Sequence, residues 1–175
     1  DVASTAMMGI DVSRAESENA LHHAYEEGKI TSGGAPPLAT TLDNKACNHS
    51  PDAQAALEDT IVLRATPGRG QAKAPLEGAF GLFQQDLPPL DITGNTPEEM
   101  AASVLRLIAC AYFRGLNCRP RKRLKGGTPA EAYTSTRPTP EELAEARQWL
   151  QELQRRQARA RVTREARRDP VRIQL

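Results

Sequence analysis

The sequence predicts an α/β fold in which at least some strands pair in parallel. Short apolar segments alternate with segments of helical periodicity along the first half of the 175 residues, an order typical of α/β proteins. Several predicted helices begin with Ser or Thr followed by Pro, a favoured start. Apolar residues make up 39% of the chain and aromatic residues only 4%, so the expected core is mainly aliphatic.

The first 65 residues contain the elements expected to form the sheet. Ser13 is predicted to begin a helix that ends at Gly28, with Glu16 in the position of a capping box. Ser50-Pro51 is predicted to begin a second helix that runs to about Asp59. Three apolar or β-branched segments around these helices are interpreted as strands: 6–12, 38–42 and 60–65.

The rest of the chain is predicted to be helical. Pro75 begins a helix with apolar residues at helical spacing as far as Leu87. Three Thr-Pro pairs, each with Glu at the third helical position, predict further helix starts at Thr96, Thr128 and Thr139.

The last of these helices is predicted to be long and poorly supported. Its apolar positions end near Leu153, and Trp149 is expected to anchor it by packing. Beyond them the sequence is almost entirely Arg, Gln and Ala. Such a stretch has little apolar surface to bury, so we expect it to be partly disordered and to become helical on a partner.

Charge is strongly segregated along the chain. Residues 114–125 carry six basic and no acidic side chains, and residues 155–175 carry eight Arg against two acids. The net charge of +1 therefore leaves −11 for the remainder. Basic blocks on an acidic body suggest docking surfaces for a polyanion such as nucleic acid; the alternative is that they are solvated helix faces and a loop.

Composition also bears on the class of protein. The chain has no run of 18 apolar residues, which argues against a membrane-spanning helix, and its N-terminus does not resemble a signal peptide. Three cysteines without CxxC spacing suit a reducing compartment and argue against a disulfide framework or zinc finger. The chain begins at Asp1 without Met, and we interpret it as a fragment or a truncated product.

Two acidic residues stand where an α/β fold places ligand sites. Asp43 follows the apolar strand at 38–42, and ligands bind at the carboxyl edge of such sheets. Glu77 lies in the first turn of the helix after the next strand. Together they could hold a divalent cation, and oxygen ligands suit Mg²⁺. Alternatively, Asp43 caps a turn and Glu77 only favours a helix N-terminus.

Four segments, in order, resemble parts of one catalytic fold. Residues 1–17 (DVASTAMMGIDVSRAES) are similar to its second and third strands, and 38–44 (LATTLDN) to the strand that ends in its second catalytic Asp. Residues 68–84 (GRGQAKAPLEGAFGLFQ) are similar to the loop and helix that carry its catalytic Glu. Residues 116–133 (LNCRPRKRLKGGTPAEAY) match its closing signature of Asn, Arg-Pro, a basic run and Gly-x-Thr-Pro-x-Glu.

These segments resemble the catalytic core of DDE transposases and integrases, which has a ribonuclease-H-like fold; the Mu-type bacterial transposases are the nearest subgroup. Between Asp43 and Glu77 lie 33 residues, which is within the family's usual spacing. The resemblance covers residues 1 to about 133. It implies a DNA-integrating enzyme, a homo-oligomer on DNA, in the bacterial cytoplasm at the nucleoid.

The resemblance also implies roles for individual residues. Asp43 and Glu77 would be catalytic and would ligate Mg²⁺ or Mn²⁺ in a two-metal site for phosphoryl transfer. Basic side chains near them and in the closing signature would contact DNA phosphates: Lys73, Arg119, Arg121, Lys122, Arg123 and Lys125.

The chain departs from the family in one important respect. The family needs an Asp on its first strand, and Asp1 and Asp11 are too close to Asp43 in sequence to supply it. We therefore expect residues 1–95 to be an N-terminally truncated catalytic core, inactive alone, 96–135 to be its closing helices with the basic loop, and 136–175 to be a basic helical tail. The alternatives are a non-catalytic DNA-binding or regulatory remnant of a transposase, and a helix-mediated assembly module.

Overall fold

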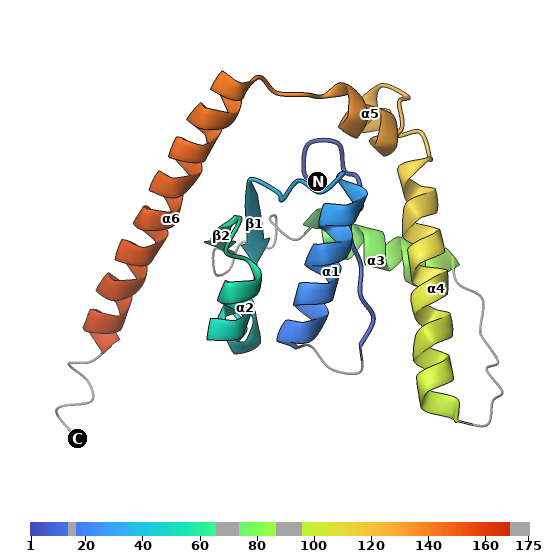
Figure 1. The fold of residues 1–175 in the computed structure, drawn as a ribbon, viewed down its shortest axis with the longest axis horizontal. Coiled ribbons are helices and arrows are strands. Elements are labelled where there is room, and N and C mark those ends of the chain that lie inside the picture. Colours follow the sequence, from blue (N-terminus) through green and yellow to red (C-terminus); the bar gives the residue numbers. More distant parts are fainter. Residues whose placement is uncertain (14–16, 66–73, 87–95, 169–175) are drawn as a thin grey trace.

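The computed structural model describes residues 1–13, 17–65, 74–86 and 96–168 and shows a mixed, mostly helical α/β fold (Figure 1). Its elements, in chain order, are α1 (Glu18–Thr31), β1 (Ala39–Leu42), the 3₁₀ helix η1 (Ala46–His49), α2 (Pro51–Ala56), β2 (Ile61–Arg64), α3 (Ala74–Asp86), α4 (Pro97–Asn117), the 3₁₀ helix η3 (Lys122–Leu124), α5 (Pro129–Ser135) and α6 (Pro140–Arg168).

The two strands pair in parallel, as the sequence predicts. Ala39 lies opposite Ile61 and Leu42 opposite Arg64. The ladder continues at both ends, because Ile61 N donates to Leu38 O at 3.2 Å and Ala65 N donates to Leu42 O at 2.7 Å. Parallel neighbours need a crossover connection, and η1 and α2 provide it. Both strands therefore end at the same edge of the sheet.

A first core cluster joins this β–α–β unit to α1. Its buried members are Tyr25 of α1, Leu42 of β1 and Leu57 at the end of α2. Leu21 and Val62 pack against them. Leu57 is only 1% exposed, so its side chain fills the centre of the unit.

A second core cluster lies on α4. Ala109, Phe113 and Leu116 are its buried residues, and Phe83 of α3 stacks on Phe113 with ring centroids 5.3 Å apart. Partly buried residues from three segments complete this cluster: Met7, Ile10, Val12, Ala79, Phe83 and Tyr112.

The N-terminal segment 6–12 is not a strand, contrary to the prediction. No strand lies beside it among the described residues, and side chains satisfy its backbone instead. The Asn117 carboxamide accepts from Met7 N and donates to Met7 O, both at 2.8 Å. Ile10 N donates to a Glu27 carboxylate oxygen at 2.9 Å. The apolar side chains of this segment therefore pack on the α4 core and do not belong to a sheet.

This segment lies between α1 and α4 and joins the two core clusters. Gly9 passes so close to α1 that a Cβ there would lie 2.0 Å from Ala24 O and 2.6 Å from Gly28 N. Asp11 forms ion pairs with Arg106 of α4 and with His23 of α1, the latter at 3.8 Å if His23 is protonated. The absence of a side chain at position 9 thus sets the distance between α1 and this segment.

The helix starts agree with prediction at some positions and differ at others. Complete capping boxes form at Thr128–Glu131 and Thr139–Glu142. Thr96 makes no capping hydrogen bond with its side chain. The first helix begins one turn later than predicted, because Ser17 accepts from Ala20 N at 3.3 Å and serves as the N-cap.

The last helix, α6, differs most from expectation. It is a continuous helix of 29 residues that lies along β2 (Figure 1). Trp149 does not anchor it by packing, because 65% of that residue is exposed. Instead, the Gln157 carboxamide accepts from Arg64 N at 2.9 Å and donates to Arg64 O at 3.0 Å, and Gln154 Nε2 donates to Val62 O at 3.0 Å.

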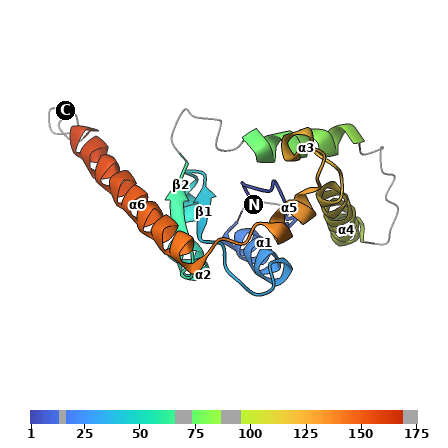
Figure 2. The same cartoon turned by 90° about the horizontal axis from the view of Figure 1, so that it is seen from above.

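Figures 1 and 2 show α6 and α4 on opposite flanks of the molecule, with the sheet, α1 and α2 between them. The short helix α5 packs against α4 and leads through residues 136–139 to the start of α6. None of the helices that the structure describes is long and apolar enough to span a membrane.

We predict that Gly9→Ala destabilises the protein. The added methyl group would overlap backbone atoms of α1, and overpacking of this kind costs about 1–3 kcal/mol. Gly115→Ala is the matched control, because nothing lies within 4 Å of its Cβ position in α4 and Ala favours a helix. Chemical denaturation of both variants measures the difference; equal stabilities would contradict the close contact between Gly9 and α1.

Candidate metal and nucleic-acid site

The carboxyl edge of the sheet holds the first candidate residue. Asp43 follows β1 directly, and its neighbour Asn44 donates from Nδ2 to Ala65 O at 2.8 Å. This bond ties the second residue after β1 to the first residue after β2. The position of Asp43 is therefore fixed by strand pairing and by a side-chain bridge between the two strand ends.

The Asp43 carboxylate is half-buried and already has partners. Its Oδ1 accepts from Asn48 Nδ2 at 2.5 Å and from Lys45 N at 3.2 Å. The bond to Lys45 N is the turn-capping role that the sequence offered as the alternative to metal binding. One carboxylate has about four acceptor positions, so these two bonds do not by themselves prevent coordination of a cation.

His49 lies next to Asp43 and is not a residue that the sequence singled out. Its Nε2 lies 2.7 Å from Asp43 O. Burial lowers the pKa of His49 below its ordinary 6.5, although the hydrogen bond with Asp43 O opposes this, and the charges of Arg64 and Arg161 lower it further. A neutral ring that donates from Nε2 satisfies these conditions.

Glu77 lies in the first turn of α3 and is exposed. The N-terminal end of α3 is the end nearer to the sheet in both ribbon views (Figures 1 and 2). The helix packs on α4 through Ala79 and Phe83. Lys73, which immediately precedes α3, lies outside the described residues.

The acidic groups of the described residues form no complete metal centre. No three His, Cys, Asp or Glu residues in the described ranges are placed to hold a metal ion together. Asp43 and Glu77 belong to segments that follow successive parallel strands. Their carboxylate oxygens have the chemistry that Mg²⁺ prefers, but a closed site would require further ligands.

The basic segment between α4 and α5 is mostly exposed. Lys122, Arg123 and Lys125 lie at the surface, and Arg123 also donates to Val2 O at 3.4 Å. Arg119 is exposed and lies over the Tyr112 ring, 5.7 Å from its centroid. Arg121 is half-buried, and its Nε has no hydrogen-bond partner among the described atoms.

Several residues of the closing signature have structural roles. Asn117 binds the Met7 backbone, as described above. Lys125 and Gly126 have φ values of 54° and 90°, which form the tight turn before α5. Hydrogen bonds from Thr128 lower the pKa of Glu131 in the capping box. The fold therefore accounts for this part of the motif. Its basic side chains are mostly exposed, although Arg119 lies over Tyr112 and Arg123 donates to Val2 O.

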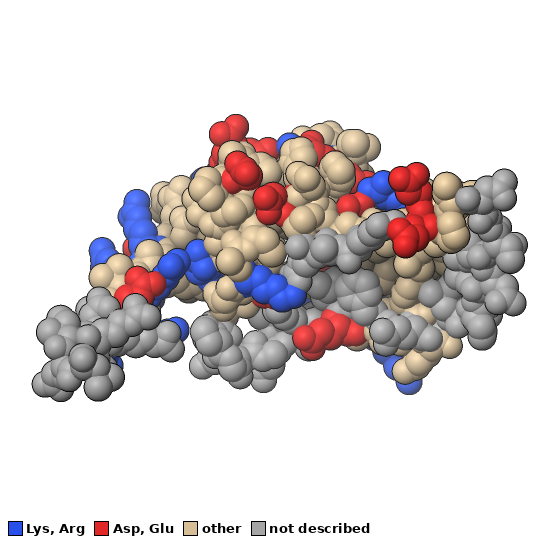
Figure 3. Space-filling view, turned by 90° about the horizontal axis from the view of Figure 1, so that it is seen from below, with Lys and Arg blue, Asp and Glu red and all other residues tan. Residues whose placement is uncertain are grey.

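Charge on the lower face of the molecule is also divided. Figure 3 shows Lys and Arg gathered on the side of α6, whereas Asp and Glu are concentrated over the lower ends of α1, α2 and α4. Between Arg155 and Glu165, α6 carries Arg155, Arg156, Arg159, Arg161 and Arg164. This part of the helix is a second basic surface, on the flank opposite α4.

A cleft of about 580 Å³ separates α6 from the β–α–β unit. The sheet side contributes His49, Leu57 and Arg64, and α6 contributes Gln157 and Arg161. Burial lowers the pKa of Arg64, and the nearby charge of Arg161 adds to this, whereas Glu165 opposes it. Because His49 also contacts Asp43 O, one wall of the cleft is the turn that holds Asp43.

Little in the sequence indicates these α6 contacts. Gln154 and Gln157 are three residues apart, so they share one face of a helix, but nothing local indicates that this face lies along a strand. Residues 47–49 (Cys-Asn-His) have no metal-ligand spacing that would indicate a site at His49.

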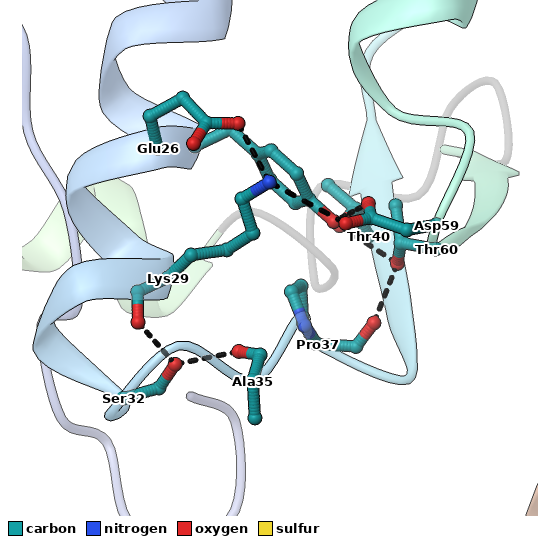
Figure 4. Close-up of polar contacts among 9 residues, drawn as sticks. Glu26, Lys29, Ser32, Ala35, Pro37, Thr40, Asp59 and Thr60 are labelled. Carbon is teal, nitrogen blue, oxygen red and sulfur yellow. Dashed lines mark hydrogen bonds and ion pairs between the residues drawn. The ribbon is translucent and has the colours of Figure 1, made fainter.

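A group of ionisable residues lies at the edge of the sheet where the strands begin, opposite Asp43, and its role is to stabilise the fold (Figure 4). Tyr25 OH donates to Asp59 Oδ1 at 2.5 Å, and Lys29 bridges Asp59 and Glu26. Thr60 Oγ1 donates to Pro37 O at 2.7 Å. Burial and the bond to Asp59 raise the Tyr25 pKa. Because these partners satisfy one another and join α1 to the α2–β2 turn, the group needs no ligand.

Comparisons with known proteins found no similarity that would assign a family. No protein-family model matches the chain, and neither the curated proteins nor the solved structures contain a significant match.

We predict that Asp59 contributes to stability above about pH 4. The bond from Tyr25, with help from Lys29, lowers the pKa of Asp59 below its ordinary 3.8. A carboxylate with a lowered pKa stabilises the fold above its unfolded-state pKa, and this contribution is lost as the pH falls through the folded-state value.

Asp59→Asn should therefore lower the stability at pH 7, on the order of the 1 kcal/mol of one hydrogen bond. It should also flatten the fall in stability below pH 4. Denaturation across pH 2–8 (roughly the range over which carboxylates titrate) measures both effects. Glu58→Gln removes a neighbouring exposed charge and serves as the control; an identical acid profile for both variants would refute the role of Asp59.

Proposed function

We propose that this chain is part of a DNA transposase or integrase, in which Asp43 and Glu77 supply two of the carboxylates of a metal-dependent strand-transfer site. The observation that carries this proposal is the order of elements around the two acids. Asp43 follows one strand, a crossover leads to a parallel neighbour, and Glu77 opens the helix after that neighbour. This order agrees with the resemblance of the two segments to the catalytic motifs of that family.

The chemistry that this arrangement suits is phosphoryl transfer. Bound Mg²⁺ ions would activate a water or a 3′-hydroxyl and stabilise the leaving oxygen. The protein's own contribution is to hold carboxylate oxygens at the carboxyl edge of the sheet. Asn44 keeps the two strand ends together, and Asn48 and Lys45 N fix the orientation of the Asp43 carboxylate. With only two carboxylates, ion binding would be weak and strand transfer by this chain alone should be absent.

The exposed basic segment would bind the DNA backbone. Lys122, Arg123 and Lys125 lie together in the short segment between α4 and α5, and none of them is buried. Such side chains give affinity that depends on salt, but they distinguish little between sequences. Arg119, held over Tyr112, would present its guanidinium group beside them.

A second candidate function is DNA binding without catalysis. It is favoured by the partners of the Asp43 carboxylate, by the exposure of Glu77, and by the lack of a third suitably placed ligand among the described residues. The two candidates share the basic surface and differ in whether Asp43 and Glu77 bind one cation together.

We predict that Mn²⁺ binds near both acids at once. Paramagnetic Mn²⁺ should broaden the backbone NMR signals of Asn44 and Gly78 over the same concentration range. Asp43→Asn should then abolish the broadening at both positions, because a shared ion needs both carboxylates. Glu98→Gln, an exposed acid in the first turn of α4, is the control and should change neither signal. If the broadening near Glu77 survives Asp43→Asn, a shared metal site is excluded. DNA binding without catalysis then remains as the candidate function.

We predict that the basic segment sets the salt dependence of DNA binding. Replacing Lys122, Arg123 and Lys125 with Gln should reduce the slope of log affinity against log salt by up to about 2.7, since each lost contact with duplex phosphate contributes about 0.9. The comparison variant replaces Arg155, Arg156 and Arg159 of α6. If the slope falls only in the α6 variant, the DNA-binding surface lies on α6 and not on the basic segment between α4 and α5.

A further inference from the structure

The helix α6 is held to the sheet by an unusual kind of contact. In the parallel ladder, the outward peptide groups of β2 belong to Val62 and Arg64, and the carboxamides of Gln154 and Gln157 bind them at 2.9–3.0 Å. Two glutamines thus take the place of a neighbouring strand. Such bonds are directional and specific, but they bury little apolar surface.

The remaining contacts of α6 with the molecule are few. No side chain of α6 that the structure describes is buried, and Leu143, Trp149 and Val162 are 42%, 65% and 65% exposed. A cleft of about 580 Å³ remains between the helix and the sheet. Arg161 also lines this cleft with Arg64, a pair of like charges that Glu165 opposes. The helix is therefore attached mainly by polar contacts, with Leu150 and Leu153 half-buried.

The segment that joins α5 to α6 would allow α6 to bind a second copy of the chain in place of its own. Residues 136–139 (TRPT) form no helix or strand, and every one of them is exposed. Four extended residues span about 13–14 Å at most. Pro138 and Pro140 favour extended backbone before them. A short, stiff connection of this kind can direct a terminal helix away from its own chain as readily as along it.

We propose that α6 is exchanged between two copies of this chain, so that Gln154 and Gln157 of each copy bind the β2 edge of the other. The partner is a second copy because its β2 edge offers the same peptide groups at the same spacing. Every contact of α6 with β2 is retained in the exchanged dimer. The proposal does not depend on the function proposed above.

Exchange would make the cleft beside Asp43 a composite site. His49, Leu57 and Arg64 would come from one copy, and Gln157, Arg161 and Glu165 from the other. The basic part of α6 would then lie next to the Asp43 turn of the second copy. A site that is completed in this way exists only in the assembled pair.

The length of the connection tests the proposal directly. Deleting Arg137 and Pro138 should prevent α6 from reaching its own β2 edge and should give a dimer. Inserting six Gly and Ser residues after Thr136 should favour docking within one chain and raise the dimer dissociation constant, on the order of tenfold or more. Light scattering after size exclusion, over a range of concentrations, measures both. Equal masses for the three chains at all concentrations would overturn exchange.

A complementation experiment distinguishes exchange from any other dimer. Gln154→Ala with Gln157→Ala gives a full chain whose α6 cannot bind but whose β2 edge is intact; Ala preserves the helix. Arg64→Pro gives a chain with an intact α6 but a β2 edge that lacks the N–H bound by Gln157. This N–H points away from β1, so the pairing of the two strands does not use it. Each variant alone should dimerise weakly, and their mixture should form a heterodimer.

The matched control replaces Gln148 and Gln151, which are exposed glutamines at the same spacing on α6, with Ala. This control should dimerise like the unchanged chain. Failure of the mixture to form heterodimers, or an equal loss of dimer in the control, would overturn the proposal. Circular dichroism of every variant checks that the helices are intact, so that a loss of dimer reports on docking.

Discussion

Parallel pairing of β1 with β2 is the constraint on which the rest of this fold depends. Two adjacent strands can run in the same direction only if the chain returns along the sheet between them. Here that return is made by η1 and α2, and it places Leu57 in the centre of the first core cluster. The same pairing brings the ends of both strands to one edge, where Asp43 and Asn44 lie. Without it, neither the first core cluster nor the candidate site would be assembled.

A sheet of two strands leaves many backbone groups without a neighbouring strand, and buried or half-buried peptide groups need partners. This protein satisfies several of them with side-chain carboxamides. Asn117 binds the backbone N–H and C=O of Met7, and Gln157 binds those of Arg64. Asn44 binds the backbone C=O of Ala65. An amide side chain carries the same donor and acceptor as a peptide group, so it can replace one position of a strand.

These carboxamide contacts differ in how much apolar packing supports them, and this difference divides the molecule into two parts. Asn117 lies beside a buried aromatic cluster, so its contact with Met7 is supported by packing. Gln154 and Gln157 lie on a helix with no buried side chain in its described part, so their contacts receive little such support. The fold therefore has a well-packed body and one flank held mainly by polar bonds. That flank is also the more basic one on its lower face (Figure 3).

Much of the local structure was determined by the sequence itself. The two strands and the capping boxes at Thr128 and Thr139 follow from signals within a few residues, since propensity and capping are local. The parallel pairing follows from the alternation of strands and helices along the first half of the chain. Other features were decided only by tertiary contacts. Segment 6–12 has the apolar composition of a strand, but among the described residues no strand lies beside it. Instead, α1 approaches Gly9, and the Asn117 side chain binds the backbone of Met7. Trp149 lies at a helical position that leaves 65% of the residue exposed, and Gln157 acquires its role from the edge of β2. Residue types and spacing place Asp43 and Glu77 after successive strands, but the partners of each carboxylate depend on side chains brought together by the whole chain.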